Sequence, residues 1–274
     1  MYPPLITLTT DFGTADGYAA QMKGVLRGLV PEAVIDDLSH DIPPHDVMAG
    51  ALFLESVIPR YPEDSVHVAV VDPGVGTTRR AVIVNWRNRL IVGPDNGLVT
   101  LLLRGAPVAE VYAICQPCRL PGVPEQLSVT FHGRDLFAPV AAYLARGGSA
   151  AGVGLRVSDP VCLPVPQPEL LSAGGVAGVV IHVDRFGNAV TNIHRKMLED
   201  IIRDGAPRIT VDRPGAGPVS ARFVRAYGEG QPGELLALIN SGDRLELAVS
   251  AGQAARQWSL AVGARVTAGL APED

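Results

Sequence analysis

The stretch "VHVAVVDPGVGTTRR" (residues 66–80) is an apolar run that ends in a carboxylate, a glycine turn and two arginines. The nearly continuous apolar character of 66–71 predicts a strand buried on both faces, as in a parallel sheet covered by helices. Asp72 stands at the carboxyl end of this strand, and Arg79 follows seven residues later. Ligands of open α/β sheets bind beyond the carboxyl ends of the strands, so this turn is a candidate site.

Strand and helix patterns alternate on both sides of this stretch. Residues 5–10 and 33–39 read as strands, and 81–86 with 89–97 read as a hairpin that turns at Arg87–Asn88. Residues 16–31, 46–61 and 133–148 read as helices, the second with Asp46 as its N-cap and the third ending at Gly147. Helical spacing of apolar residues supports the first helix, through Tyr18, Met22, Val25, Leu26 and Leu29. The alternation predicts an N-terminal α/β domain, residues 1–155, with a mostly parallel sheet and helices on both faces.

The pattern changes after this domain. The segment "PVCLPVPQP" (160–168) has four prolines in nine residues, which predicts a stiff extended linker over 156–174. Short strand patterns then follow one another from 175 to 274, with helical patterns only at 195–202 and 253–258. Such spacing predicts a small C-terminal β-barrel or sandwich.

Bulk composition limits the possible partners. The 274 residues are 47% hydrophobic and carry 23 basic against 28 acidic residues, a formal net charge of −5. An acidic chain without basic runs is not built around a nucleic-acid face or an anionic membrane. The sequence has no signal-peptide pattern and no apolar run of about 18 residues, so we expect a cytoplasmic, soluble protein.

The three cysteines are Cys115, Cys118 and Cys162. The spacing of "CQPC" (115–118) allows a metal or redox interpretation, but no second CxxC accompanies it, and a loop rather than a helix follows. We therefore expect ordinary thiols and no disulfide framework.

Polar side chains gather where predicted strands end. They are Asp11 after the first strand, His40, Asp41, His45 and Asp46 after the second, Asp72 after the third, and the segments 93–97 and 130–135. Their placement predicts convergence on one pocket. Each residue also has a structural interpretation: an aspartate before glycine caps turns, the histidines serve as loop or structural residues, and Gly74 and Gly76 supply unusual backbone angles. Arg134 and Asp135 are expected to form an ion pair at a helix start.

The same residue types permit a metal centre. Asp11, His40, His45, Asp72 and His132 are possible ligands of a metallohydrolase. None of them forms a tight ligand motif such as HxH or HExxH. The glycine turn also lacks the Lys-Ser/Thr ending of a phosphate-binding Walker motif.

Seven segments, in order, resemble the S-adenosyl-L-methionine (SAM) hydroxide adenosyltransferases, relatives of the fluorinases and chlorinases. They are "TLTTDFGTADGYAAQMKG" (7–24), "DLSHDIPPHDV" (37–47), "VVDPGVGTTRR" (70–80), "VGPDNGL" (92–98), "TFHGRDLFAPVAAYLARG" (130–147), "VDRFGNAVTNI" (183–193) and "INSGDRLELAVSAGQAA" (239–255). The resemblance implies conversion of SAM and water to adenosine and L-methionine, without a metal or other cofactor. It also implies homotrimers with sites at subunit interfaces.

The resemblance further implies roles for single residues. The catalytic set of the hydrolytic members falls on Asp72, Arg79 and His132. Substrate binding falls on Asp11 for the ribose, Asp16 and Asp184 for the methionine, Phe186 and Asn188 for the adenine, and Asn240, Ser241 and Ala254 for the rest of the nucleoside site. An arginine follows the serine in the halogenases, but Gly242 and Asp243 follow Ser241 here, and His45 stands where the halogenases have a tryptophan.

Rival functions remain open. The halogenases have tyrosine at the positions of Asp72 and His132, so the sequence favours water over a halide as the nucleophile. The alternatives are a 5′-halogenating (chlorinase-like) transferase, a SAM- or adenosine-binding module without turnover, and a metal-dependent hydrolase.

Overall fold

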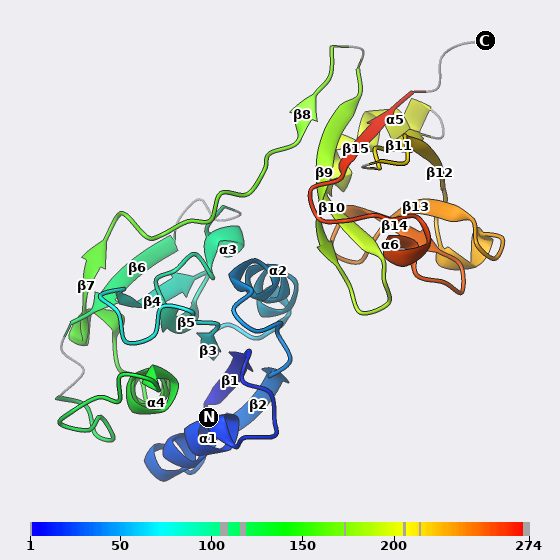
Figure 1. Ribbon diagram of the computed structural model, residues 1–274. Coiled ribbons are helices and arrows are strands. Elements are labelled where there is room, and N and C mark those ends of the chain that lie inside the picture. The colour runs from blue at the N-terminus through cyan, green and yellow to red at the C-terminus, as the bar shows by residue number, and fades with distance from the viewer. Residues whose placement is uncertain are drawn as a thin grey trace. The chain divides into compact units, whose positions relative to one another are not determined.

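The computed structural model describes residues 2–104, 109–115, 119–172, 174–204, 207–213 and 215–270. The chain divides into two compact units, residues 1–163 and 164–274, and the boundary falls inside the proline-rich stretch (Figure 1). The linker expected over 156–174 stays a prediction. Two short strands reach into that span, β7 (Gly154–Val157) and β8 (Glu169–Leu170).

The first unit is built on a seven-stranded sheet of order β2-β1-β3-β5-β4-β6-β7. Its strands are β1 (Leu5–Thr10), β2 (Val34–Ser39), β3 (Val66–Val70), β4 (Ala81–Trp86), β5 (Arg89–Pro94), β6 (Ala109–Ile114) and β7. The pairs β2–β1, β1–β3 and β3–β5 are parallel, whereas β4 is antiparallel to both neighbours and β7 is antiparallel to β6. Five strands thus run one way and only β4 and β7 run the other, which confirms the predicted mostly parallel sheet.

Helices cover both faces of this sheet (Figure 1). They are α1 (Tyr18–Leu29), α2 (Val47–Val57) with the 3-10 turn η1 (Ile58–Arg60), α3 (Thr100–Arg104), the π-helical turn η3 (Gly133–Phe137), α4 (Ala138–Ala145) and the 3-10 turn η4 (Ala150–Gly152). α1 and α4 pack together in one core with Ile6 and Leu8 of β1. α2 and α3 pack in the other core with Val82 and Val84 of β4. The predicted two-faced α/β layer is therefore confirmed.

The local signals explain the ends of several elements. Asp46 caps α2, because its carboxylate accepts a hydrogen bond from the Ala49 N–H at 2.9 Å. Arg87 and Asn88 have φ of 50° and 59°, the left-handed pair of a two-residue hairpin turn between β4 and β5. Gly147, with φ of 86°, follows the end of α4.

The second unit is a closed barrel of seven strands in the order β10-β14-β13-β12-β11-β15-β9, with β9 pairing back to β10. The strands are β9 (Val176–Val183), β10 (Ala189–His194), β11 (Arg208–Val211), β12 (Val219–Phe223), β13 (Leu235–Ile239), β14 (Arg244–Val249) and β15 (Arg265–Gly269), with β8 added beside β9. Short helices connect them: η5 (Arg195–Met197), α5 (Glu199–Asp204), η6 (Tyr227–Glu229) and α6 (Ala254–Gln257). Closure removes the sheet edges and encloses one apolar core, as predicted for the β-barrel.

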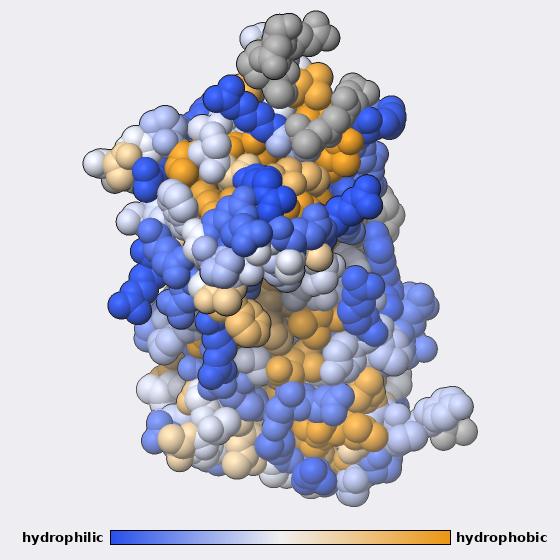
Figure 2. Space-filling view, turned by 90° about the vertical axis from the view of Figure 1, so that its right-hand side faces the viewer, coloured by the Kyte–Doolittle hydropathy of each residue, from blue (hydrophilic) through white to orange (hydrophobic). Residues whose placement is uncertain are grey.

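Polar and charged side chains cover much of the face in Figure 2, with apolar side chains visible between them. Within the described residues, no helix is both long enough and apolar enough to cross a bilayer. Cys115 and Cys162 are free thiols. Cys118, the second cysteine of the CxxC spacing, lies outside the described residues.

Candidate active site

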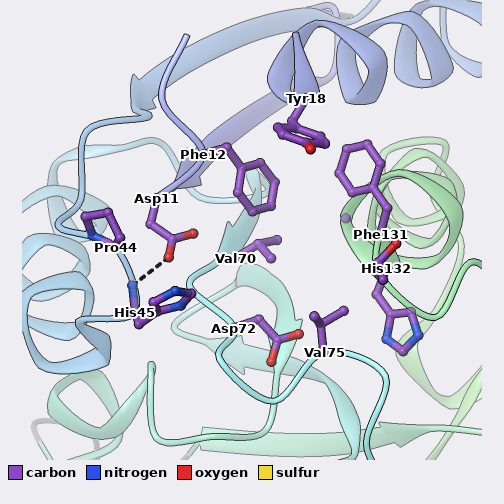
Figure 3. Close-up of a pocket in the computed structure, with 12 residues that line it drawn as sticks. Asp11, Phe12, Tyr18, Pro44, His45, Val70, Asp72, Val75, Phe131 and His132 are labelled. Carbon is purple, nitrogen blue, oxygen red and sulfur yellow. Dashed lines mark hydrogen bonds between the residues drawn. The ribbon is translucent and has the colours of Figure 1, made fainter. Parts of the chain in front are cut away.

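A cavity of about 320 Å³ opens beyond the carboxyl ends of β1 and β3 (Figure 3). Four separate stretches line it: the turn after β1 with the start of α1, the loop before α2, the turn after β3, and the segment 130–133. The lining residues are Asp11, Phe12, Tyr18, Pro44, His45, Val70, Asp72, Val75, Thr130, Phe131, His132 and Gly133. The predicted convergence is confirmed for Asp11, His45, Asp72 and His132.

The turn after β3 holds an ion pair between Asp72 and Arg79. The Arg79 Nε lies 3.1 Å from Oδ1 and 3.0 Å from Oδ2 of Asp72, and Nη2 donates a further bond to Oδ2. The two side chains are only 4% and 10% exposed. Charge-assisted, two-nitrogen contacts of this kind add geometric specificity, so the carboxylate is held in one orientation.

Arg79 also reaches His132. Its Nη2 lies 2.7 Å from Nδ1 of His132. A guanidinium can only donate, so Nδ1 must be the acceptor and the neutral imidazole carries its proton on Nε2. Burial, and then the positive charge of Arg79, lower the pKa of His132 from its ordinary value. The neutral tautomer with Nε2–H is therefore the favoured form near pH 7.

Gly76 lets the turn after β3 lie against the segment that carries His132. Its φ is 78°, and a Cβ at this position would stand 2.3 Å from the carbonyl oxygen of Val129. Gly74 is different, because a Cβ there would meet nothing closer than 3.5 Å. Only Gly76 is thus required by a close backbone approach.

Asp11 and His45 form the opposite side of the cavity. The His45 N–H donates to Oδ2 of Asp11 at 2.9 Å, the dashed contact in Figure 3. His45 has φ of 65°, a left-handed conformation that is uncommon for residues other than glycine. The hydrogen bond to Asp11 helps to hold this conformation, and Figure 3 shows the His45 ring directed into the cavity.

An aromatic wall completes the cavity. Phe12, Tyr18 and Phe131 meet edge to face, with ring centroids 5.2–5.9 Å apart. Helical spacing groups Tyr18 with the apolar residues of α1, but the residue is 45% exposed and lines the cavity. Phe12 follows Asp11 in the chain and Phe131 precedes His132. This adjacency is the sequence feature that could have indicated both rings as site residues.

Other polar residues at the strand ends have structural roles. His40 is buried and its Nδ1 lies 2.8 Å from Thr10 Oγ1. Asp95 is buried and accepts from Arg80 Nε at 2.7 Å and from the backbone N–H of Val161 at 2.8 Å. Arg134 pairs with Asp135 at 2.6 Å, as predicted for the helix start, and this contact is the first cause of the lowered pKa of Asp135. Asp16 is exposed and does not line the cavity.

The possible metal ligands do not form a ligand group in the described part of the chain. Within the ranges that the structure describes, no three His, Cys, Asp or Glu side chains are arranged to hold a metal ion. His40, one of the five possible ligands, bonds Thr10 and does not line the cavity.

The barrel unit carries the other residues singled out by the sequence. Oδ1 of Asp184 accepts from the N–H groups of Phe186 and Asn188, and its Oδ2 accepts from the Asn188 side chain at 3.1 Å. The turn between β9 and β10 is therefore fixed by Asp184 itself. It presents the Phe186 ring with 76% of its surface exposed. Ala254 is fully buried at the start of α6, and the backbone of residue 255 bonds Gly187 in that turn.

The turn between β13 and β14 is fixed by Asn240. Its Nδ2 donates to Glu246 Oε2 at 2.9 Å, and its Oδ1 accepts from the N–H groups of Gly242 and Arg244. Ser241 is exposed at the tip of this turn. Glu246 is buried and also accepts from Tyr227 Oη at 2.7 Å, a contact that no sequence pattern indicated.

Comparisons with known proteins agree along almost the whole chain. The family model of the SAM hydroxide adenosyltransferase N-terminal domain matches residues 6–154, and that of the C-terminal domain matches 178–267. A protein of Salinispora tropica named (R)-S-adenosyl-L-methionine hydrolase is 42% identical over 97% of this chain and 98% of its own length. A protein of Nocardia brasiliensis named fluorinase is 31% identical over 96% of each chain.

A solved structure has the same fold. It is an uncharacterised conserved protein of Thermotoga maritima with a TM-score of 0.86 and 33% identity, covering 96% of this chain and 99% of that one. Together, the two matched domain models span most of the residues from 6 to 267. The chain therefore belongs to the SAM hydroxide adenosyltransferase family.

Proposed function

We propose that this protein hydrolyses S-adenosyl-L-methionine to adenosine and L-methionine, by attack of a water molecule on C5′. The observation that carries the proposal is the hydrogen-bonded chain from Asp72 through Arg79 to His132 on one wall of the cavity. Family membership supports SAM as the substrate. The names of the more similar relatives support hydrolysis as the reaction and the (R) epimer at the sulfonium as the form of SAM that reacts.

The chemistry needs a nucleophile more than an acid. The sulfonium is already a good leaving group, whereas neutral water is a weak nucleophile. A water held in line with the C5′–S bond, at a near-attack distance of roughly 3–3.5 Å, removes much of the entropic barrier. The Asp72 carboxylate can accept a hydrogen bond from this water, and the Nε2–H of His132 can donate one to it. Two fixed contacts would set both its position and the direction of its lone pair.

The surroundings of the reacting atoms also affect the transition state. Attack of water on the sulfonium spreads the positive charge over the sulfur, C5′ and the attacking oxygen, so an apolar surround favours the transition state over the reactants. The aromatic wall of Phe12, Tyr18 and Phe131 provides such a surround on one side of the cavity. The proposed mechanism needs no metal ion or cofactor, since every step is assigned to side chains of this chain.

We assign binding roles within the same proposal. Asp11 would accept hydrogen bonds from the ribose hydroxyls, and Asp16 and Asp184 would face the methionine ammonium. Phe186 and Asn188 would contact the adenine, with Asn240, Ser241 and Ala254 completing the nucleoside site. Because Asn240 and Asn188 are bonded within their own turns, we expect them to act mainly by shaping those turns.

Assembly and location are part of the proposal. We propose a homotrimer in which barrel residues of one subunit complete the cavity of the next, and a cytoplasmic location. The exposed ring of Phe186 is a feature that a subunit contact would cover. A native mass three times that of the 28.8 kDa chain is the expected result. A monomeric mass with full activity would contradict the shared site.

A halogenating activity is the rival within the family. A carboxylate at Asp72 disfavours it, because two like charges 4 Å apart repel by about 4 kcal/mol at an effective dielectric constant of about 20. Relatives named fluorinases are more distant than those named hydrolases, at 31% identity or below.

The test incubates purified protein with separated (R) and (S) epimers of SAM, with and without chloride, fluoride and a chelator. We expect adenosine and methionine in equal amounts from the (R) epimer, unaffected by chelator or halide. A 5′-halogenated nucleoside would favour the rival, chelator-sensitive release would favour a metal hydrolase, and bound SAM without product would favour a binding module.

A further inference from the structure

Hydrolysis by neutral water releases a proton, and its destination follows from the hydrogen bonds around the cavity. As the O–C5′ bond forms, the C5′–S bond breaks and its electron pair goes to the sulfur of methionine. The attacking oxygen must then lose one proton to become the 5′-hydroxyl of adenosine. The groups of the cavity that could accept it are Asp11, Asp72, His45 and His132.

Asp72 is a poor acceptor of this proton. Both its oxygens face Arg79, and the pair is nearly buried, so a proton on the carboxylate would leave the guanidinium without its counter-charge. Oδ1 receives only the 3.1 Å contact from Nε. It therefore keeps a lone pair with which to orient the water.

His132 has no lone pair to offer. Its Nδ1 lone pair is directed at Arg79 Nη2, 2.7 Å away, and Arg79 does not give up a proton in proteins. The other nitrogen, Nε2, then carries the hydrogen in the neutral ring. His132 can donate a hydrogen bond to the nucleophile, but it can accept a proton only by breaking its contact with Arg79.

Of the two groups that remain, Asp11 is assigned to the ribose hydroxyls in the proposed function, so His45 is the acceptor that stays available. Its ring enters the cavity from the loop before α2 (Figure 3), and among the described residues no group is bonded to its imidazole nitrogens. Its backbone is fixed by the N–H contact to Asp11, whose carboxylate is thereby occupied on Oδ2. His45 is also solvent-exposed, so an imidazolium formed there can pass its proton to bulk water.

We infer that His45 is the general base of the reaction, while Asp72 and His132 orient the water. The inference rests on the proposed hydrolysis and adds a proton acceptor outside the Asp72–Arg79–His132 chain. Charged and titratable groups from several elements lie around His45 and would affect how readily it accepts a proton. They are Asp11 after β1, Tyr18 of α1, Asp46 at the start of α2, Asp72 and Arg79 after β3, and His132 before η3.

The test measures the single-turnover rate of SAM cleavage from pH 5 to 9, so that product release does not mask the chemical step. With a histidine base, the wild-type rate falls about tenfold per pH unit on the acid side of the profile, where the imidazole is protonated. The variant His45→Asn tolerates the left-handed backbone and keeps the N–H contact to Asp11. We expect it to lose about 10²-fold or more in rate at pH 8 and to lose the acid limb.

The matched variant is His132→Asn, whose amide oxygen can still accept from Arg79. It should react more slowly than the wild type yet keep the acid limb. A third variant, His45→Gly, suits φ of 65° and leaves space, so added imidazole should restore much of its rate. Bound SAM, measured by calorimetry, shows that each variant is folded.

The possible results distinguish a failure of the His45 role from a failure of the proposed hydrolysis. An acid limb that persists in His45→Asn, or one that disappears in His132→Asn, overturns the role of His45 while leaving the hydrolysis intact. If the wild type forms no adenosine at any pH, the hydrolysis itself fails and the inference fails with it.

Discussion

Arg79 touches the Asp72 carboxylate through two of its nitrogens, Nε at 3.0 Å from Oδ2 and Nη2 on the same oxygen. The contact spans seven residues of chain and closes the turn after β3 over itself. It ties both ends of a glycine-rich turn together and holds the Asp72 carboxylate at the lip of the cavity.

Replacing Asp72 should affect turnover far more than binding. Asp72→Ala removes the group that orients the water, whose effect is made only in the transition state. We expect kcat to fall by about 10²–10³-fold, with the dissociation constant of SAM changed less than about threefold. Steady-state kinetics and calorimetry measure the two quantities. Asp41→Asn, an exposed acid of the loop after β2, is the control. Equal losses in binding and turnover would show that Asp72 instead holds the substrate.

Arg79 should control the protonation of His132. Burial and then the charge of Arg79 lower the pKa of His132, while the Asp72 carboxylate raises it. Arg79→Gln removes the cation and leaves the carboxylate unopposed, so the pKa of His132 should rise. A histidine NMR titration reports this directly, with the exposed Arg60→Gln as the comparison. A pKa of His132 that is the same in both variants would mean that Arg79 does not act on the ring.

The two glycines of the turn after β3 should differ sharply. Gly76→Ala places a Cβ 2.3 Å from the Val129 carbonyl oxygen and strains a φ of 78°. It should displace the segment that carries His132 and lower kcat by about tenfold or more, since small misplacements are costly. Gly74→Ala meets nothing closer than 3.5 Å and serves as the matched control with near-normal activity. Comparable losses in the two variants would refute the close-approach argument.

His67 should make the first unit acid-sensitive. It is buried between Thr7 and Ser65, and burial, with Arg89 second, lowers its pKa from 6.5 to about 4. Between these pH values the unfolded chain binds more protons than the folded chain, so stability falls as the pH drops from 6.5 to 4. The shift corresponds to about 3 kcal/mol at most.

Urea unfolding at several pH values tests this dependence. Trp86 lies in the first unit and Trp258 in the second, so a Trp258→Phe background makes fluorescence report the unit that contains His67. His67→Gln should be less stable at pH 7 but should lose less stability on acidification. The same pH slope with and without His67→Gln would exclude it as the cause.

Local sequence signals predict much of the fold. The continuous apolar run of β3, the Asp46 cap and the left-handed Arg87–Asn88 turn each follow from one stretch of chain. The parallel pairing of β12 with β13 inside the barrel could not be foreseen, because it depends on distant residues meeting. The sequence patterns likewise do not indicate β6, β7 and β15 as separate strands.

Site residues at strand ends could be predicted from the sequence. Site residues whose position depends on tertiary packing could not. Asp11, Asp72 and His132 could be anticipated from position and resemblance. Tyr18 could not, since its helical spacing suggests a core residue, yet the start of α1 turns its ring to the cavity. His40 is a strand-end histidine that is buried on Thr10 and does not line the cavity, in line with its structural interpretation.

The central claim is that a water molecule held by Asp72 and His132 attacks C5′, and oxygen labelling tests it most directly. The protein is incubated with (R)-SAM in H₂¹⁸O, and the adenosine is analysed by mass spectrometry with fragmentation. An incubation without protein under the same conditions gives the uncatalysed background. We predict one ¹⁸O atom in the 5′-hydroxyl of every adenosine formed. Unlabelled adenosine, or a 5′-halogenated nucleoside in its place, would contradict the account.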